Sequence, residues 1–147
     1  MKPGFSRLVI AAALALTAAP GHAQVRQLWT GPSHPEDVLA GSPAMRRAWH
    51  DAVPPAMRSQ LWLYDLHGTA SAIGVMPIAG RRYITGTVCK PHDCGPHNAA
   101  FLIALDNGRA VGALDINPSG RGPRHATFFG NPTPGEQAEL MATLYGG

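Results

Sequence analysis

The chain has 147 residues, with 12 lysines and arginines, 9 aspartates and glutamates and two cysteines. Residues 24–147 are enough for one domain with a single core and too few for two. Two of the basic residues, Lys2 and Arg7, lie near the N-terminus, and elsewhere the basic residues form no run longer than a pair. Because binding along nucleic-acid phosphates requires a basic stripe, we do not expect a nucleic-acid partner.

The first 23 residues have the pattern of a secretory signal peptide. Lys2 and Arg7 both precede an uncharged stretch over residues 8–19. Pro20 and Gly21 follow this stretch and precede the small residue Ala23. The uncharged stretch is too short to span a bilayer. We therefore expect residues 1–23 to be removed and residues 24–147 to reach the periplasm as a domain without a membrane anchor.

Helices are expected in the N-terminal part of the mature chain. Residues 24–42 are rich in proline, glycine and serine and predict an extended arm with about one turn of helix. The dipeptide Ser42-Pro43 is typical of a helix N-cap and first position. Apolar residues then recur on one helix face: Met45, Ala48, Trp49 and Ala52. Pro54-Pro55 should end this helix, and a short helical or irregular segment should follow over residues 57–63.

Antiparallel strands are expected from residue 69 onward. Alternating and β-branched segments predict five strands, over residues 71–78, 82–88, 99–105, 109–116 and 125–129. Turn residues at 79–80 and 106–108 should join the first four strands into two hairpins. The strand over residues 82–88 runs directly into Cys89.

A final helix is predicted by the capping box of residues 133–136, which places proline at the first helical position. An apolar stripe should lie on the sheet: Leu140, Met141, Leu144 and Tyr145. The order of elements indicates an α+β fold, with an antiparallel sheet of about five strands, flanking helices, a single domain and a protruding disulfide-closed loop.

The most specific motif is the segment Cys89-Lys90-Pro91-His92-Asp93-Cys94. In an exported chain, an even pair of cysteines with four residues between them predicts a disulfide. Pro91 fixes one backbone angle and biases Lys90 toward extended geometry. The tip should therefore present His92 with little conformational freedom left to lose on binding.

This segment, between a strand and Gly95, resembles the signature loop of the inhibitor of vertebrate lysozyme family. The resemblance implies that the loop protrudes from the sheet and that His92 enters the cleft of a c-type lysozyme, between its catalytic carboxyl groups. Lys90 would face acidic groups on the rim of the cleft, and Asp93 would keep the loop in shape by accepting from Lys90 or a backbone amide. It also implies a protein inhibitor. The sequence offers neither a nucleophile with a base nor a cluster of metal ligands, so we expect no catalytic residue, metal or cofactor.

Other interpretations remain open from the sequence. The same loop could restrain the lytic transglycosylases of the producing cell, which also depend on a carboxyl acid in a cleft. A zinc site made by Cys89, Cys94, His92 and His97 is disfavoured because oxidised sulfurs cannot bind metal, and a redox pair is disfavoured because the spacing is not C-x-x-C. His97 is expected to cap or pack beside the loop. A homodimer is compatible with the sequence, which does not decide it.

Overall fold

The computed structural model describes residues 27–106, 108–117 and 121–146. The predicted signal peptide over residues 1–23 lies outside these residues. No helix in the described ranges is long and apolar enough to cross a membrane.

The described residues form one antiparallel sheet of seven strands, in the order β1-β3-β4-β5-β6-β7, with β2 beside the end of β4. The strands are β1 Gln27–Leu28, β2 Thr69–Ala70, β3 Gly74–Ile78, β4 Arg81–Cys89, β5 His97–Ala104, β6 Ala110–Ile116 and β7 Ala126–Phe129. The helices are α1 Pro35–Gly41, α2 Pro43–Ala52, the 3-10 helix η1 Pro55–Met57, α3 Leu61–Tyr64 and α4 Pro134–Tyr145. The α+β fold and its five main strands, β3 to β7, are as predicted. The two-residue strands β1 and β2 are not predicted, because two residues are too few for an alternating pattern.

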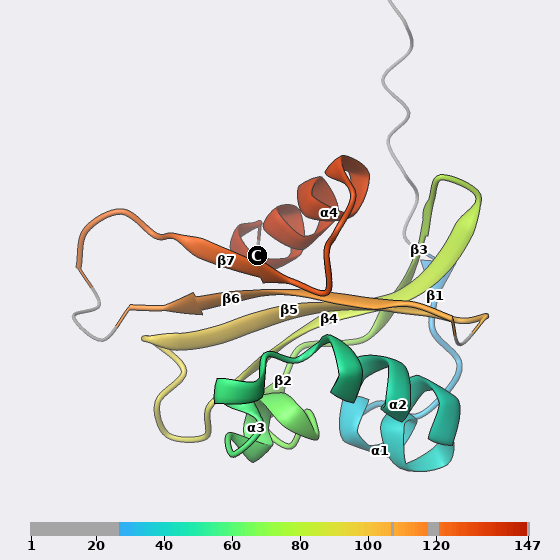
Figure 1. The fold of residues 1–147 in the computed structure, drawn as a ribbon, viewed down its shortest axis with the longest axis horizontal. Helices are drawn as coiled ribbons and strands as arrows, with labels where there is room; N and C mark the ends of the chain where they lie inside the picture. The colour runs from blue at the N-terminus through green and yellow to red at the C-terminus, as the bar shows by residue number, and fades with distance from the viewer. Residues whose placement is uncertain (1–26, 107, 118–120, 147) are drawn as a thin grey trace, which may run out of the picture.

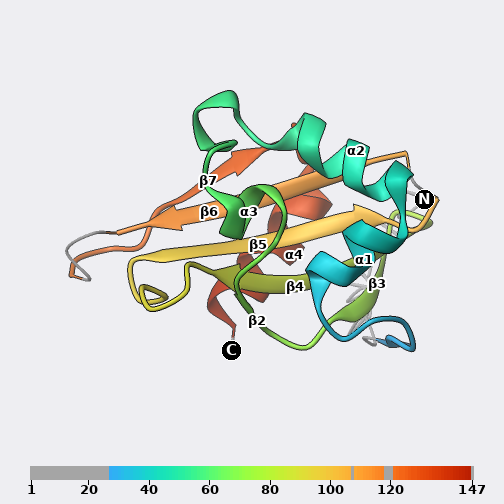
Figure 2. The same ribbon diagram turned by 90° about the horizontal axis from the view of Figure 1, so that it is seen from below.

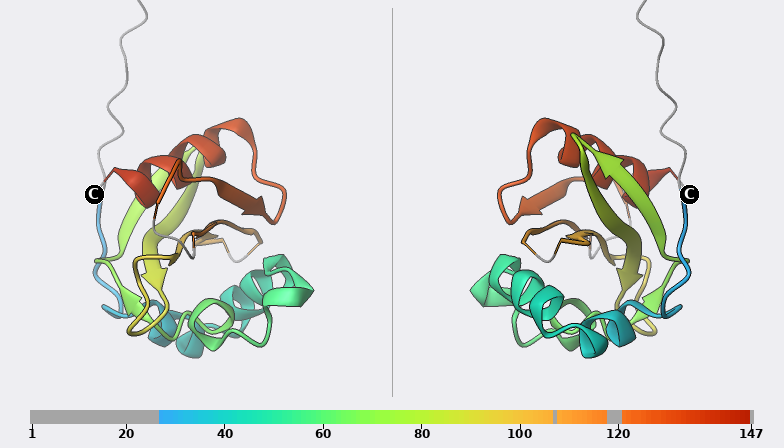
Figure 3. Two further views of the ribbon diagram at one scale, coloured as in Figure 1. Left: turned by 90° about the vertical axis from the view of Figure 1, so that its left-hand side faces the viewer. Right: turned by 90° about the vertical axis from the view of Figure 1, so that its right-hand side faces the viewer.

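Helices cover both faces of the sheet. Helix α4 lies on one face, and α1, α2 and α3 lie on the other (Figure 1). The sheet curves between these two layers, as the end-on views in Figure 3 show. Strand β5 contributes to both cores, since Phe101 and Ile103 face α2 while Ala100 and Leu102 face α4. Burial on both faces explains why this strand has an almost continuous apolar sequence.

The predicted helix after Ser42 is α2, and its N-terminus has the expected cap. The Ser42 hydroxyl accepts from the Met45 amide at 3.3 Å. Trp49 is fully buried and lies edge-on to Phe101 of the sheet, at a centroid distance of 6.4 Å. Its Nε1 donates to the Leu63 carbonyl at 2.9 Å. This bond joins α2 to α3 and so fixes the helical layer beneath the loop.

Helix α4 begins with the predicted capping box, and its glutamate has a second role. The Glu136 carboxylate is buried, accepts from the Thr133 amide at 2.7 Å and accepts from Arg109 Nε and Nη2 at 2.6 and 2.7 Å. Tyr83 Oη donates to the same carboxylate at 2.6 Å. We call Glu136, Arg109, Tyr83 and Thr133 the Glu136 cluster. It anchors α4 to β4 and to the residue that precedes β6.

The predicted apolar stripe of α4 needs one correction. Leu140 is fully buried and Leu144 packs against the same core, but Met141 is exposed. Successive helical residues point about 100° apart, so Met141 is turned away from the surface that Leu140 contacts.

Candidate functional site: the loop between β4 and β5

The predicted loop leaves the sheet at the end of β4 and returns at the start of β5. Cys89 is the last residue of β4 and lies opposite Asn98 of β5. The Lys90 amide, one residue further, donates to the His97 carbonyl at 3.1 Å. A disulfide joins Cys89 to Cys94, with their Cα atoms 4.8 Å apart. The predicted disulfide is therefore confirmed, and it closes the loop at the last paired residues of the hairpin.

Pro91 and His92 occupy the tip of a tight turn. The Asp93 amide donates to the Lys90 carbonyl at 3.0 Å, and the two residues between them are exposed. His92 has a positive φ of 63°. Proline followed by a residue with positive φ is the pattern of a type II turn, and this conformation is uncommon for a residue other than glycine. Among the described residues, no hydrogen bond or ion pair holds the His92 ring, so its two nitrogens are available to a partner.

The other polar side chains of the loop have partners within it. Lys90 Nζ lies 3.3 Å from Asp93 Oδ2, as expected, and His97 Nδ1 lies 2.9 Å from the same oxygen. Asn98 Nδ2 donates to the Cys94 carbonyl. The sequence predicts a position for His97 beside the loop, but it does not predict the contact with Asp93.

The helical layer supports the base of the loop. Thr69 of β2 pairs with Cys89, so the segment after α3 runs along the end of β4. A Cβ atom on Gly68 would lie 2.4 Å from the Cys89 carbonyl oxygen, so only glycine allows this close approach. Figure 2 shows the loop at the end of the sheet, beside α3. This support was not predicted, since the only sequence signal for it is one glycine.

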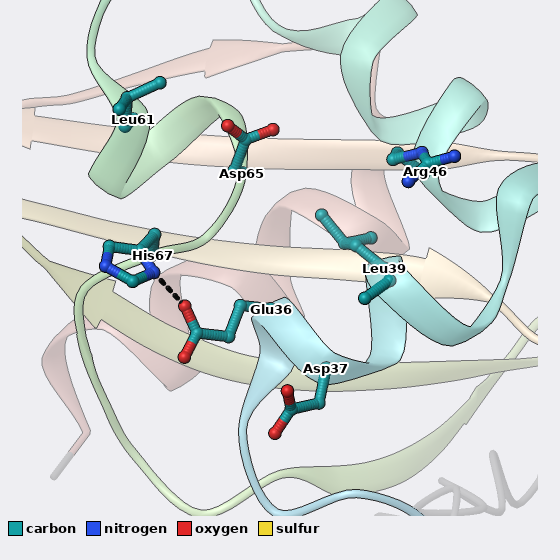
Figure 4. A pocket seen from close by; sticks show the side chains of 8 residues that line it. Glu36, Asp37, Leu39, Arg46, Leu61, Asp65 and His67 are labelled. Carbon is teal, nitrogen blue, oxygen red and sulfur yellow. Dashed lines mark hydrogen bonds and ion pairs between the residues drawn. The ribbon is translucent and has the colours of Figure 1, made fainter.

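A hollow of about 470 Å³ lies near the loop, between α1, α2 and α3 (Figure 4). It is lined by Glu36, Asp37, Leu39, Ala40, Arg46, Leu61, Asp65 and His67. Glu36 and His67, which contact each other, also line a smaller hollow of about 190 Å³ that Pro91 borders. None of these residues except Pro91 is predicted as a site residue.

Most of the carboxylates that line this hollow have partners. Asp65 Oδ1 lies 3.0 Å from His50 Nε2, so two of the three carboxylates in the lining contact an imidazole. The lining contains no serine, threonine or cysteine that could serve as a nucleophile. Across the described ranges, no three metal-ligating side chains come together. Compared with this hollow, the loop between β4 and β5 has the more specific geometry.

The comparisons with known proteins agree with the family resemblance of the loop sequence. A family model described as "Inhibitor of vertebrate lysozyme (Ivy)" matches residues 44–126, which extend from α2 to the start of β7 and include the whole loop. A Pseudomonas aeruginosa protein named "Inhibitor of vertebrate lysozyme" is 30% identical over 140 residues, which cover 95% of this chain and 78% of the relative. An uncharacterized protein of the same organism is 27% identical over 139 residues, covering 90% of each chain. The family match spans more than half of the sequence, and the chain therefore belongs to the inhibitor of vertebrate lysozyme family.

Proposed function

We propose that this protein inhibits a c-type lysozyme by inserting the loop Cys89–Cys94 into the catalytic cleft, with His92 between the two catalytic carboxyl groups. The observation that carries the proposal is the exposed His92 ring, which stands at the tip of a turn closed by a disulfide. Family membership supports the same function, because a relative with 30% identity carries the name of a lysozyme inhibitor.

The chemistry of the two partners is complementary. Lysozyme uses a protonated glutamic acid and an ionised aspartate that flank the scissile bond. An imidazole carries nitrogens on two edges, and in its protonated form both donate. One ring could therefore bridge both carboxyl groups with charge-assisted hydrogen bonds while it excludes the sugar and the attacking water.

The loop is held in shape before it meets a partner. The disulfide, the turn bond from Asp93 to Lys90 and the ladder bond from Lys90 to His97 restrict the backbone on both sides of His92. A surface that is already ordered loses less conformational entropy on binding. We infer that this order allows a loop of only six residues to act as an inhibitor.

The protein would act stoichiometrically and outside the cytoplasm. An inhibitor whose loop fills the cleft does not need to turn over substrate, so we propose no catalytic residue, metal or cofactor for this protein. Disulfides persist in oxidising compartments, which supports the predicted export to the periplasm. There the protein would meet an incoming lysozyme before the enzyme reaches peptidoglycan.

Assays of cell-wall lysis with two purified enzymes in parallel, a c-type lysozyme and a bacterial lytic transglycosylase, test this function. We expect stoichiometric inhibition of the lysozyme. His92→Ala should raise the inhibition constant well over tenfold, because loss of a buried charged contact at an interface costs about 2 to 4 kcal/mol. His125→Ala, which truncates another exposed histidine, should leave inhibition unchanged.

The outcomes separate the targets. Inhibition of the transglycosylase without inhibition of the lysozyme would mean that the loop acts on the alternative target. A wild-type protein that inhibits neither enzyme, or a His92→Ala variant as potent as the wild type, would contradict the proposal.

A further inference from the structure

His97 lies directly behind the loop, at the first position of β5. We propose that His97 is a positioning residue: its ring holds Asp93, and through Asp93 it holds the turn that carries His92. This inference rests on the proposed function, because the position of His92 matters only if His92 enters a partner.

The contact between His97 and Asp93 is close, and it is an ion pair only when the His97 ring is protonated. His97 Nδ1 lies 2.9 Å from Asp93 Oδ2, yet the ring nitrogen makes no well-aligned hydrogen bond. The distance is that of an ion pair, while the direction of the N–H group is unfavourable for a hydrogen bond. The His97 side chain is only 23% exposed and that of Asp93 39%, so the contact lies partly out of solvent.

Trp62 also contacts the His97 ring. This α3 side chain is buried, and its ring meets the His97 ring edge-on, at 6.5 Å between centroids and 76° between planes. The imidazole therefore contacts both a core aromatic ring and the Asp93 carboxylate. A continuous set of contacts then runs from α3 through Trp62 and His97 to the loop.

Asp93 links the His97 ring to the turn that carries His92. It follows His92 directly in the chain, and its amide closes the turn on the Lys90 carbonyl. Its carboxylate faces two basic side chains, Lys90 at 3.3 Å and His97 at 2.9 Å. Of the two, Lys90 belongs to the loop and moves with it, whereas His97 belongs to the sheet. Of the two side-chain contacts of Asp93, the one with His97 therefore ties the turn to the sheet, in addition to the disulfide and the backbone bond from Lys90 to His97.

A double-mutant cycle with His97→Phe and Asp93→Asn tests the coupling. Phenylalanine keeps a ring against Trp62 but removes the nitrogen, so packing and charge are separated. Against a purified c-type lysozyme, each variant should inhibit about three- to tenfold more weakly. The double variant should be no weaker than Asp93→Asn alone, since both substitutions remove the same contact. His125→Phe, the same substitution at an exposed histidine, should have no effect.

Hydrogen exchange in the free protein provides a measurement that does not depend on any lysozyme. The Asp93 amide, which closes the turn, should exchange about tenfold faster in His97→Phe, while core amides of β5 keep their wild-type rates. Unchanged exchange at Asp93, or fully additive losses of inhibition in the cycle, would overturn the inference. If the wild type inhibits no lysozyme, the proposed function fails and the exchange rates alone decide the role of His97.

Discussion

The two ends of β4 carry polar clusters that are built in opposite ways. Near its start, Tyr83 joins the Glu136 cluster, in which the carboxylate is almost completely removed from solvent. At its other end, six residues and about 20 Å further along the strand, Cys89 opens the loop. There the polar side chains are partly exposed, and His92 at the tip is exposed.

This difference shows how one sheet can serve stability and binding separately. In the Glu136 cluster, every polar group that surrounds the carboxylate donates to it, which a buried charge requires. In the loop, a covalent bond and short local contacts fix the backbone, so the tip keeps its shape without burying His92. We therefore expect damage to the first cluster to unfold the protein and damage to the second to abolish inhibition.

The largest effect on stability is expected for Glu136→Gln. The substitution leaves the Arg109 guanidinium half-buried without its anion and weakens the bond from Tyr83, and breaking a buried ion pair in this way costs about 3 to 5 kcal/mol. Urea unfolding measures the loss. The folded fraction should still inhibit lysozyme with the wild-type constant.

Glu139→Gln is the matched control for this substitution. Glu139 lies on the same helix but is only partly buried, and its carboxylate accepts from a single hydroxyl, that of Thr143 at 3.1 Å. It should change stability by less than about 1 kcal/mol. Equal losses for the two variants would mean that the Glu136 cluster has no special role.

The stability that the Glu136 cluster provides should be lost in acid. Burial alone would raise the pKa of Glu136, but hydrogen bonds from Arg109, Tyr83 and the Thr133 amide outweigh it and lower the pKa to about 2. Because this pKa lies below the ordinary value of 4.5, the stabilisation is complete above about pH 4.5 and is lost as the pH falls through 2. The shift corresponds to about 3 kcal/mol.

Urea unfolding at a series of acidic pH values measures this dependence. The wild type should lose most of that stability between about pH 4.5 and about pH 2, and Glu136→Gln should lack this part of the loss. A variant with the same pH profile as the wild type would contradict the assignment.

Removal of the disulfide should affect stability less than Glu136→Gln does, but it should have a large effect on inhibition. In the simple closure model, a six-residue loop contributes about 2 kcal/mol to stability. The double variant Cys89→Ser, Cys94→Ser should therefore remain folded but inhibit lysozyme at least tenfold more weakly, because ordering of the loop then opposes binding. Circular dichroism and the lysis assay measure the two quantities. Global unfolding, or unchanged inhibition, would show that the loop is not an independent binding element.

The sequence predicts those features that depend on neighbouring residues. The cap of α2 at Ser42, the capping box of α4, the two hairpins and the Cys89–Cys94 disulfide all involve partners close in the chain, and all are present. The loop, which carries the family resemblance, is predictable for the same reason.

The missed features join residues that are distant in sequence or depend on how elements pack. Glu136 is predicted as a helix cap, but its ion pair with Arg109 spans 27 residues and exists only because α4 lies across the sheet. Trp62 is buried in the core, and its contact with the His97 ring follows from the docking of α3 beside β5. The exposure of Met141 likewise depends on the angle at which α4 meets the sheet.

The central claim is that His92 lies between the catalytic carboxyl groups of lysozyme, and a double-mutant cycle across the interface tests it most directly. Binding of wild type and His92→Ala is measured by calorimetry with native lysozyme and with a lysozyme in which the catalytic glutamic acid or aspartate is replaced by its amide. Against the native enzyme, His92→Ala should lose about 2 to 4 kcal/mol. Against the amide variants, the loss should be smaller by at least about 1 kcal/mol, since an amide replaces a carboxyl group that the His92 ring would contact. An equal loss with native and variant lysozymes would place His92 away from the catalytic carboxyl groups and contradict the account.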